Sequence, residues 1–99
     1  MESRMDPHLA LLERVARQDR VAFKALYKAY YQPLSHFLIR MLKHQDVVEE
    51  IVDDVMFTVW EKAADFGGRS KVSTWIIGIA YRKGLKSYNR HRREPGWMT

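Results

Sequence analysis

The chain has 99 residues, no cysteine and a formal net charge of +5. This length predicts one small domain, and the lack of cysteine excludes both a disulfide framework and a thiolate metal site. The four histidines show no metal-ligand spacing. Because no apolar run approaches the roughly 20 residues of a membrane-spanning helix, and no secretory signal opens the chain, we expect a cytoplasmic protein.

The charged residues are distributed unevenly. Residues 1–43 carry 8 basic and 4 acidic side chains, residues 44–66 carry 1 and 7, and residues 67–99 carry 8 and 1. An acidic block between basic blocks indicates two faces with partners of opposite charge. Ordinary solvated charge is the alternative, and composition alone favours it slightly.

Two helices are predicted in the first half of the chain. Residues 8–17 have the apolar stripe of a short amphipathic helix. Asp19 is then predicted to cap a longer helix, whose apolar spacing continues to about Lys43. Because Pro33 lies inside this helix and lacks the N–H that an α-helix uses, we expect a kink or a break there.

A third helix is predicted to open at Asp46, with Glu49 in the position of a capping box. Its apolar stripe consists of Val48, Ile51, Val52, Val55 and Val59. Its other side carries carboxylates, namely Glu49, Glu50, Asp53, Asp54 and Glu61. Phe57 projects into the middle of that acidic side, with Trp60 at its edge. An aromatic residue inside a charged rim is typical of a binding anchor. Singly exposed apolar residues are also common, so the helix alone gives about even odds that Phe57 is an anchor.

Gly67 and Gly68 are predicted to end this helix, because glycine adopts backbone conformations closed to other residues. Ser73 or Thr74 is predicted to cap a fourth helix, whose first turns are apolar and should be enclosed. In its later turns Tyr81, Leu85 and Tyr88 share one face, and Arg82, Lys83, Lys86, Asn89 and Arg90 share the opposite one.

Two glycines lie inside the predicted fourth helix. Gly78 and Gly84 each cost about 0.8–1 kcal/mol relative to alanine. Close approach of another backbone is one explanation for them.

These elements predict an all-α fold, a compact bundle of about four helices with a recognition loop between the third and fourth. Residues 1–7 are expected to be disordered, residues 8–93 to form the helical domain, and residues 94–99 to start a linker.

No pattern of catalytic residues is present: there is no nucleophile motif and no Walker-type phosphate loop. We therefore expect no enzymatic activity, no cofactor and no metal. A basic helix next to a loop with Phe66, Arg69 and Lys71 is better suited to nucleic acid, since cations attract phosphates and aromatic rings stack on unpaired bases. For the ring of Trp75, core packing is the favoured alternative, about two to one.

Three fragments of the chain match one family pattern in order and spacing. The first is D-x-x-A-F-x-x-L-Y-x-x-Y, here Asp19, Ala22, Phe23, Leu26, Tyr27 and Tyr30. The second is D-x-A-E-D-L-x-Q-E-x-F-x-x-V-W, here Asp46, Val48, Glu49, Glu50, Ile51, Asp53, Asp54, Met56, Val59 and Trp60. The third is F-x-G-x-S-x-x-x-T-W-L-x-x-I-A, here Phe66, Gly68, Ser70, Thr74, Trp75, Ile76, Ile79 and Ala80. From about Leu11 to Arg93 the chain thus resembles the second conserved region of the extracytoplasmic-function (ECF) group of bacterial sigma factors.

The resemblance implies promoter recognition and melting within RNA polymerase holoenzyme. The acidic helix would dock on the clamp helices of the polymerase β′ subunit through Glu49, Glu50, Asp53, Asp54, Phe57 and Trp60. The loop would capture a base flipped from the non-template strand of the −10 promoter element, through Phe66, Gly68, Arg69, Ser70, Lys71, Ser73, Thr74 and Trp75. The last helix would contact DNA where melting starts, through Arg82, Lys83, Lys86, Asn89 and Arg90. An anti-sigma factor is a further implied partner.

The chain departs from the family pattern at several points. Asp53 replaces a usual Gln, Arg82 a usual Asn and Lys86 a usual Asp, which puts the details of polymerase contact and promoter preference in doubt. The resemblance also implies a C-terminal helix-turn-helix domain that recognises the −35 element, which these 99 residues do not include. Either the sequence was cut near Pro95 or this is an unusual single-domain protein, and we expect the cut.

Two other functions stay open. A sigma-like module that binds polymerase or an anti-sigma factor without DNA would not need Arg69, Lys71 and the basic face. A helical domain that binds duplex DNA nonspecifically would have no use for the acidic face around Phe57.

Overall fold

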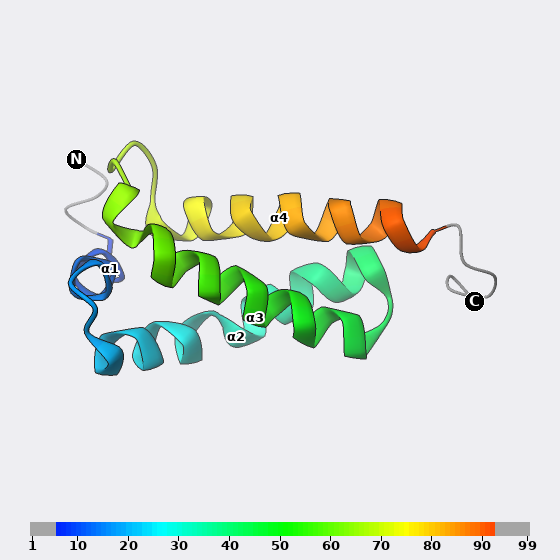
Figure 1. Ribbon diagram of the computed structural model, residues 1–99, viewed down its shortest axis with the longest axis horizontal. Coiled ribbons are helices and arrows are strands. Elements are labelled where there is room, and N and C mark those ends of the chain that lie inside the picture. The colour runs from blue at the N-terminus through cyan, green and yellow to red at the C-terminus, as the bar shows by residue number, and fades with distance from the viewer. Residues whose placement is uncertain (1–5, 93–99) are drawn as a thin grey trace.

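The computed structural model describes residues 6–92. In chain order they form α1 (Leu9–Ala16), α2 (Arg20–Leu42), α3 (Gln45–Lys62), the short 3-10 helix η2 (Ala63–Asp65) and α4 (Val72–His91). Helices α2, α3 and α4 run along the long axis of the molecule, and α1 is seen end-on at one end, near the loop that leads into α4 (Figure 1). Over the described residues there is no strand, which confirms the all-α prediction.

The core lies where the long helices face one another. All five apolar positions predicted for α3 are buried, and Met56 joins them. Helix α2 contributes Leu26, Leu34, Leu38 and Leu42, each with no exposed surface, and α4 contributes Ile76, Ile79 and Ala80. Burying a side chain such as leucine or isoleucine favours folding by about 1.5–3 kcal/mol. This packing fixes which sides of α3 and α4 face the solvent.

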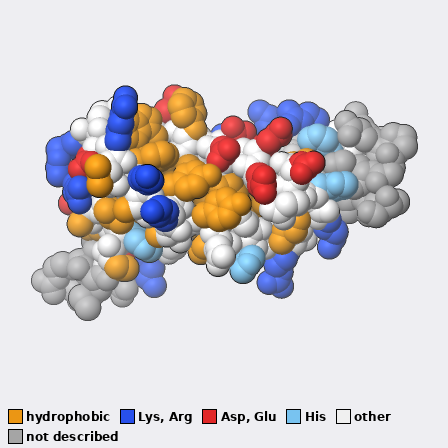
Figure 2. All heavy atoms as spheres, turned by 90° about the horizontal axis from the view of Figure 1, so that it is seen from below, with side chains coloured by type: hydrophobic (Ala, Val, Ile, Leu, Met, Phe, Trp, Pro, Cys, Tyr) orange, Lys and Arg blue, Asp and Glu red, His pale blue; other side chains and the backbone are white. Residues whose placement is uncertain are grey.

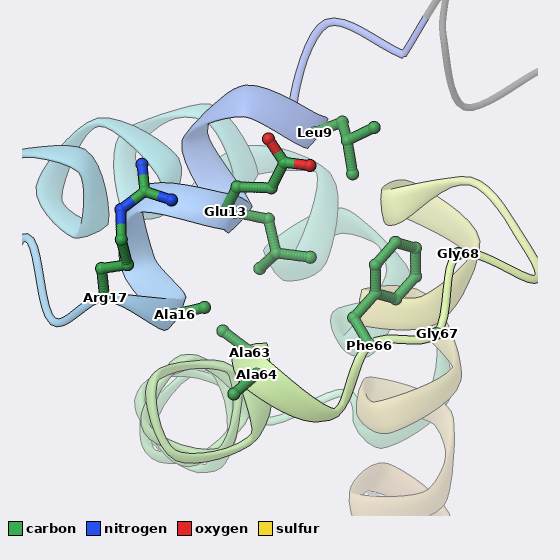
Figure 3. Close-up of a pocket in the computed structure, with 10 residues that line it drawn as sticks. Leu9, Glu13, Ala16, Arg17, Ala63, Ala64, Phe66, Gly67 and Gly68 are labelled. Atoms are coloured by element: carbon green, nitrogen blue, oxygen red, sulfur yellow. The ribbon is translucent and has the colours of Figure 1, made fainter.

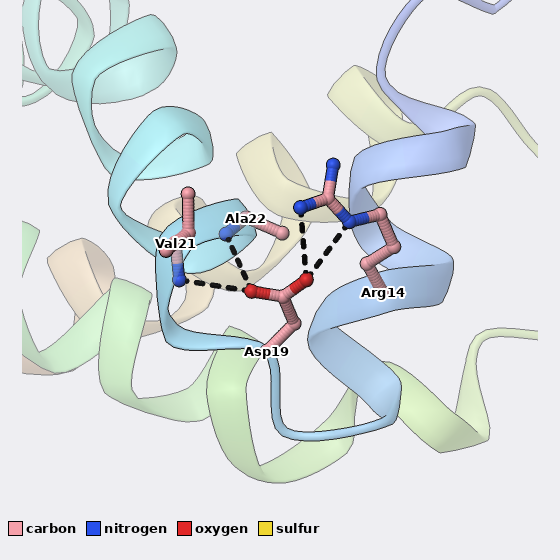
Figure 4. A network of polar contacts seen from close by, with 4 residues as sticks. All are labelled: Arg14, Asp19, Val21 and Ala22. Atoms are coloured by element: carbon pink, nitrogen blue, oxygen red, sulfur yellow. Dashed lines mark hydrogen bonds and ion pairs between the residues drawn. The ribbon is translucent and has the colours of Figure 1, made fainter.

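Asp19 caps α2 as predicted. Its Oδ1 accepts hydrogen bonds from the N–H groups of Val21 at 3.0 Å and Ala22 at 3.1 Å, while its Oδ2 accepts one from Nε of Arg14 at 2.9 Å (Figure 4). The backbone hydrogen bond from Ala22, followed by the bond from Arg14, holds the pKa of Asp19 below its ordinary value. Helix α1 is thereby fastened to the start of α2.

Helix α2 continues from Arg20 to Leu42, so the chain does not break at Pro33, and the kink that was the other expectation stays a prediction. The proline removes one N–H from the helical ladder. Leu34 and Leu38 on the turn that follows are fully buried, and their packing outweighs that local cost.

The predicted N-cap of α3, Asp46, was wrong by two residues. The helix begins at Gln45 with His44 as its N-cap residue, and Asp46 lies inside the first turn rather than at the cap. A carboxylate in the first turn is still favoured there, because it faces the positive end of the helix dipole.

The predicted cap of α4 was also wrong. The helix begins at Val72, so Ser73 and Thr74 both lie inside its first turn. The N–H of Val72 donates instead to Oδ2 of Asp6, at 2.7 Å. Asp6 falls in the segment expected to be disordered, but this bond, with another at 3.0 Å from the N–H of His8 to its Oδ1, fixes its side chain. The linker expected at 94–99 lies outside the described residues.

The two glycines of α4 have different surroundings. A Cβ added to Gly84 would lie 2.9 Å from Cδ2 of Leu38 and 2.9 Å from Sδ of Met41. The close neighbours are therefore side chains of α2 and not the backbone that we expected. A Cβ on Gly78 would have only the guanidinium of Arg82 near it, at 3.6 Å. A side chain at position 84 would therefore force Leu38 and Met41 to move, whereas a side chain at position 78 would not.

Candidate protein-binding and nucleic-acid surfaces

The solvent side of α3 carries the predicted acidic face. Its exposed carboxylates are Glu49, Glu50, Asp53, Asp54 and Glu61. Phe57 lies on the same side of the helix with 60% of its surface exposed. Phe57 therefore contributes little to the core and is available to a partner. Trp60 is half-buried and packs against the core, so only part of its ring is available.

Aromatic residues of α2 border the acidic face. The ring of Phe23 packs edge-on against Trp60 with centroids 5.2 Å apart, and Tyr27 stacks on Tyr31 at 6.1 Å. Figure 2 shows hydrophobic side chains gathered in the middle of one face of the molecule, beside a group of Asp and Glu side chains. The sequence interpretation missed Tyr31, although its spacing of four residues from Tyr27 could have indicated it.

One hydrogen bond connects the aromatic residues to the acidic face. The hydroxyl of Tyr27 donates to Oδ1 of Asp53 at 2.6 Å. This bond, followed by desolvation, raises the pKa of Tyr27 to about 12. Asp53, one of the positions that departs from the family pattern, is therefore oriented by a residue of the neighbouring helix.

The loop 66–71 connects η2 to α4 and forms a small hollow. Its volume is about 360 Å³, and its lining residues are Asp65, Phe66, Gly67, Arg69, Ser70 and Trp75. The rings of Phe66 and Trp75 lie 5.3 Å apart with 54° between their planes. Gly68 has a φ of +74°, a conformation that glycine adopts without strain. The hollow thus combines two aromatic rings with a guanidinium and a hydroxyl.

The structure brings only some of the predicted loop residues to this hollow. Phe66, Arg69, Ser70 and Trp75 line it, while Gly68, Lys71, Ser73 and Thr74 do not. Trp75 also packs partly against the core. The ring of Trp75 therefore both packs against the core and lines the hollow. The sequence interpretation treated these two roles as alternatives.

A second hollow lies on the other side of the loop, against α1. Its volume is about 580 Å³, and it is lined by Leu9, Leu12, Glu13, Ala16, Arg17, Ala63, Ala64, Phe66, Gly67 and Gly68. The side chain of Phe66 points into the space between the loop and α1 (Figure 3). Sequence periodicity gave no sign of this hollow, because its two walls are far apart in the chain.

The basic face of α4 differs in part from its prediction. Arg82, Lys86, Asn89 and Arg90 are exposed, but Lys83 is half-buried. Tyr81 and Leu85, expected on the side of α4 opposite the basic residues, are also exposed, by 49% and 40%. The buried side consists of Val72, Ile76, Ile79, Ala80, Gly84 and Ser87. Packing on α2 and α3 selects that side, and it leaves Tyr81 and Leu85 in solvent together with the basic residues.

Neither a metal site nor a membrane-spanning helix is found in residues 6–92. No group of His, Asp and Glu side chains there is arranged to hold a metal ion. No helix in that part of the chain is long and apolar enough to cross a membrane.

Comparison with known proteins decides the family. The family model for Sigma-70 region 2 matches residues 26–94, which include the acidic face, the loop and the basic face. The chain belongs to the sigma-70 region 2 family.

Its relatives confirm the resemblance to the ECF group. This sigma region 2 domain is 34% identical over 80 residues to the ECF RNA polymerase sigma factor RpoE of Cereibacter sphaeroides, covering 79% of this chain and 44% of that protein. It is 36% identical over 70 residues to the ECF RNA polymerase sigma factor SigX of Bacillus subtilis, covering 71% and 36%. It is 30% identical over 91 residues to the ECF RNA polymerase sigma factor SigK of Mycolicibacterium vanbaalenii, covering 91% and 45%.

The chain therefore spans less than half the length of these relatives. No solved structure matches it.

Proposed function

We propose that this domain binds core RNA polymerase and recognises and opens the −10 element of promoters, as region 2 of an ECF sigma factor. The observation that carries the proposal is the presence of two distinct surfaces on one small domain. One is an exposed aromatic residue on an acidic helix face, and the other is an aromatic hollow in the loop that leads into a helix with a basic face. Family membership supports the assignment of these surfaces to polymerase and DNA.

The acidic face has the chemistry to bind a basic helical surface. Phe57 is exposed on α3 among carboxylates, an arrangement in which the aromatic residue supplies most of the binding energy and the charged rim excludes wrong partners. In the proposal the partner is the pair of clamp helices of the polymerase β′ subunit. Glu49, Glu50, Asp53 and Asp54 supply the rim, and Trp60 contributes its exposed edge.

The loop has the chemistry to hold an unpaired base. Phe66 and Trp75 offer ring faces, and Arg69 offers hydrogen-bond donors to base edges. The hydroxyl of Ser70 donates to the carbonyl of Lys71 at 3.0 Å, and its oxygen can accept from a base. Arg82, Lys86 and Arg90 on α4 attract phosphates of the displaced strand and set its position. Flipping a base out of a duplex costs a few kcal/mol, and the contacts in the hollow and on the basic face would offset that cost.

An oligonucleotide titration tests the DNA half of the proposal. We expect the domain to bind single-stranded non-template oligonucleotides with an ECF-type −10 element more tightly than their duplexes or scrambled single strands. Affinity should fall with salt, by about 0.7 log units per log unit of salt for each phosphate neutralised. Equal affinity for scrambled strands would favour the nonspecific DNA-binding function instead. Polymerase binding without any DNA binding would favour the sigma-like module.

A further inference from the structure

The first N–H of α4 is bonded by a residue from near the other end of the chain. Oδ2 of Asp6 accepts from the N–H of Val72 at 2.7 Å, across 66 positions of sequence. Lys71, the N-cap residue of α4, makes no side-chain capping bond of its own. Asp6 therefore supplies the carboxylate that a local Ser, Thr, Asp or Asn normally provides at a helix start, where the helix dipole favours negative charge.

A second set of contacts ties the same N-terminal turn to the same helix end. The hydroxyl of Tyr30 in α2 lies 2.8 Å from Nδ1 of His8, and the two rings meet edge-on at 4.9 Å. The side chain of Ser73 hydrogen-bonds to the same tyrosine. Tyr30 is only 3% exposed, and this burial, together with the charge of Asp6, raises its pKa to about 12. Its hydroxyl therefore stays protonated at neutral pH. The first turn of α4 has two attachments to the N-terminal half, namely Val72 to Asp6 and Ser73 to Tyr30.

The loop 66–71 has a contact with the rest of the domain at each end. At one end the N–H of Phe66 donates to the carbonyl of Ala63 at 3.2 Å, and the ring of Phe66 packs partly against the core. At the other end Val72 is bonded to Asp6. In the middle, a Cβ added to Gly68 would have no atom within 4 Å. The position of the end of the loop next to α4 therefore depends on Asp6.

We propose that Asp6 is a positioning residue for the loop 66–71. By holding the N–H of Val72 it fixes the end of the loop next to Arg69 and Ser70, together with the first turn of α4, which carries Trp75, and so keeps the smaller hollow in a shape that accepts an unpaired base. Without this bond the loop end would have to be ordered on binding, at a cost in affinity. The base-binding part of this inference rests on the proposed function, whereas the fixing of the loop end does not.

The experiment compares Asp6→Ala with two controls. Asp6→Asn retains a side-chain oxygen that can accept from Val72, since Asn and Asp cap helices about equally well. Asp19→Ala removes the cap of α2, away from the start of α4. Amide hydrogen exchange by NMR is measured at Val72, Ser73 and Trp75 in each variant, and binding to a single-stranded −10 oligonucleotide is titrated in parallel at several salt concentrations.

We expect exchange at these amides to be about fivefold faster in Asp6→Ala, the size typical of one lost capping bond. Oligonucleotide affinity should fall by about the same factor, with an unchanged salt dependence because no phosphate contact is lost. Asp6→Asn should stay near wild type in both measurements. Asp19→Ala should leave exchange at the start of α4 unchanged.

Other outcomes overturn the inference. Unchanged exchange at Val72 in Asp6→Ala, or an equal change in Asp19→Ala, would show that Asp6 does not hold the loop end specifically. Faster exchange with unchanged oligonucleotide affinity would show that the bond has no positioning role. If the wild-type domain itself shows no preference for the −10 strand over a scrambled one, the proposed function fails, and the exchange measurements alone decide whether Asp6 fixes the loop.

Discussion

The acidic face of α3 and the loop 66–71 are two candidate binding surfaces that are built in different ways. The acidic face belongs to a regular helix, so its side chains are placed by helical spacing and by the buried stripe behind them. The loop has no regular backbone. One of its ends is held by the bond from Val72 to Asp6, and the other by the bond from Phe66 to Ala63 and by the packing of Phe66 on the core. A surface of the first kind tolerates single substitutions without losing its shape. A surface of the second kind depends on contacts made far away in the sequence.

Removing the anchor of the acidic face should give the largest effect. We expect Phe57→Ala to weaken binding to the β′ clamp helices by about 2 kcal/mol or more, the cost typical of a hot-spot aromatic residue. Because the ring is 60% exposed, thermal stability should change little. Val21, an apolar residue of α2 with 73% exposure, supplies the control Val21→Ala, which should leave binding unchanged. Calorimetric titration with a clamp-helix fragment measures both, and lost stability with unchanged affinity would contradict the anchor.

The two glycines of α4 give the next largest effect, with opposite signs. Gly84→Ala should lower the free energy of unfolding by about 1–2 kcal/mol, because its Cβ would press on the buried Leu38 and on Met41 and overpacking outweighs the gain in helix propensity. Gly78→Ala should raise it by about 1 kcal/mol, since only the guanidinium of Arg82 is near. Urea unfolding of both variants measures the difference. Equal changes would show that the close approach of α2 does not constrain α4.

Lys86→Ala should distinguish the role of α4 in DNA binding from the role of the loop 66–71. If Lys86 contacts a phosphate, its loss should weaken the binding of every oligonucleotide about fivefold at 0.1 M salt. The slope of log affinity against log salt should become about 0.7 less steep. By contrast, exchanging the loop 66–71 for that of a sigma factor with another promoter should change which base is preferred. Fluorescence titration against oligonucleotides with each base at the candidate flipped position tests both. A changed base preference in Lys86→Ala alone would reverse the two roles.

The smallest expected effect concerns the bond between Tyr27 and Asp53. The pKa of Tyr27 is raised to about 12 in the folded state, so the stabilisation from this bond is fully present below pH 10 and is lost as the pH rises through 12. In Asp53→Asn the pKa of this tyrosine should move down toward 10. Spectrophotometric titration of the phenols, with Tyr27→Phe to assign the signal, measures the shift. An unchanged titration curve in Asp53→Asn would contradict the role of the bond.

Periodicity along the chain was enough to predict the helices and the acidic face. Helical spacing predicted the five buried apolar positions of α3, and all of them are in the core. Asp19 was predicted as a cap and is one, because a cap interacts with amides only two or three residues away. The exposure of Phe57 follows from the same periodicity. These features depend on neighbours along one helix, so a single sequence contains the information to place them.

The features that join distant segments could not be predicted in this way, because they depend on how the helices pack. The cap of α4 comes from Asp6, 66 residues away, while the nearby Ser73 and Thr74 take no part in it. The continuity of α2 through Pro33, the lack of room for a Cβ at position 84 and the wall that α1 provides for the second hollow likewise depend on how the helices pack. Local preferences of this kind amount to about 1–3 kcal/mol each, and packing that buries several leucines exceeds them. Periodicity along one helix carries no information about which distant residue supplies such a contact.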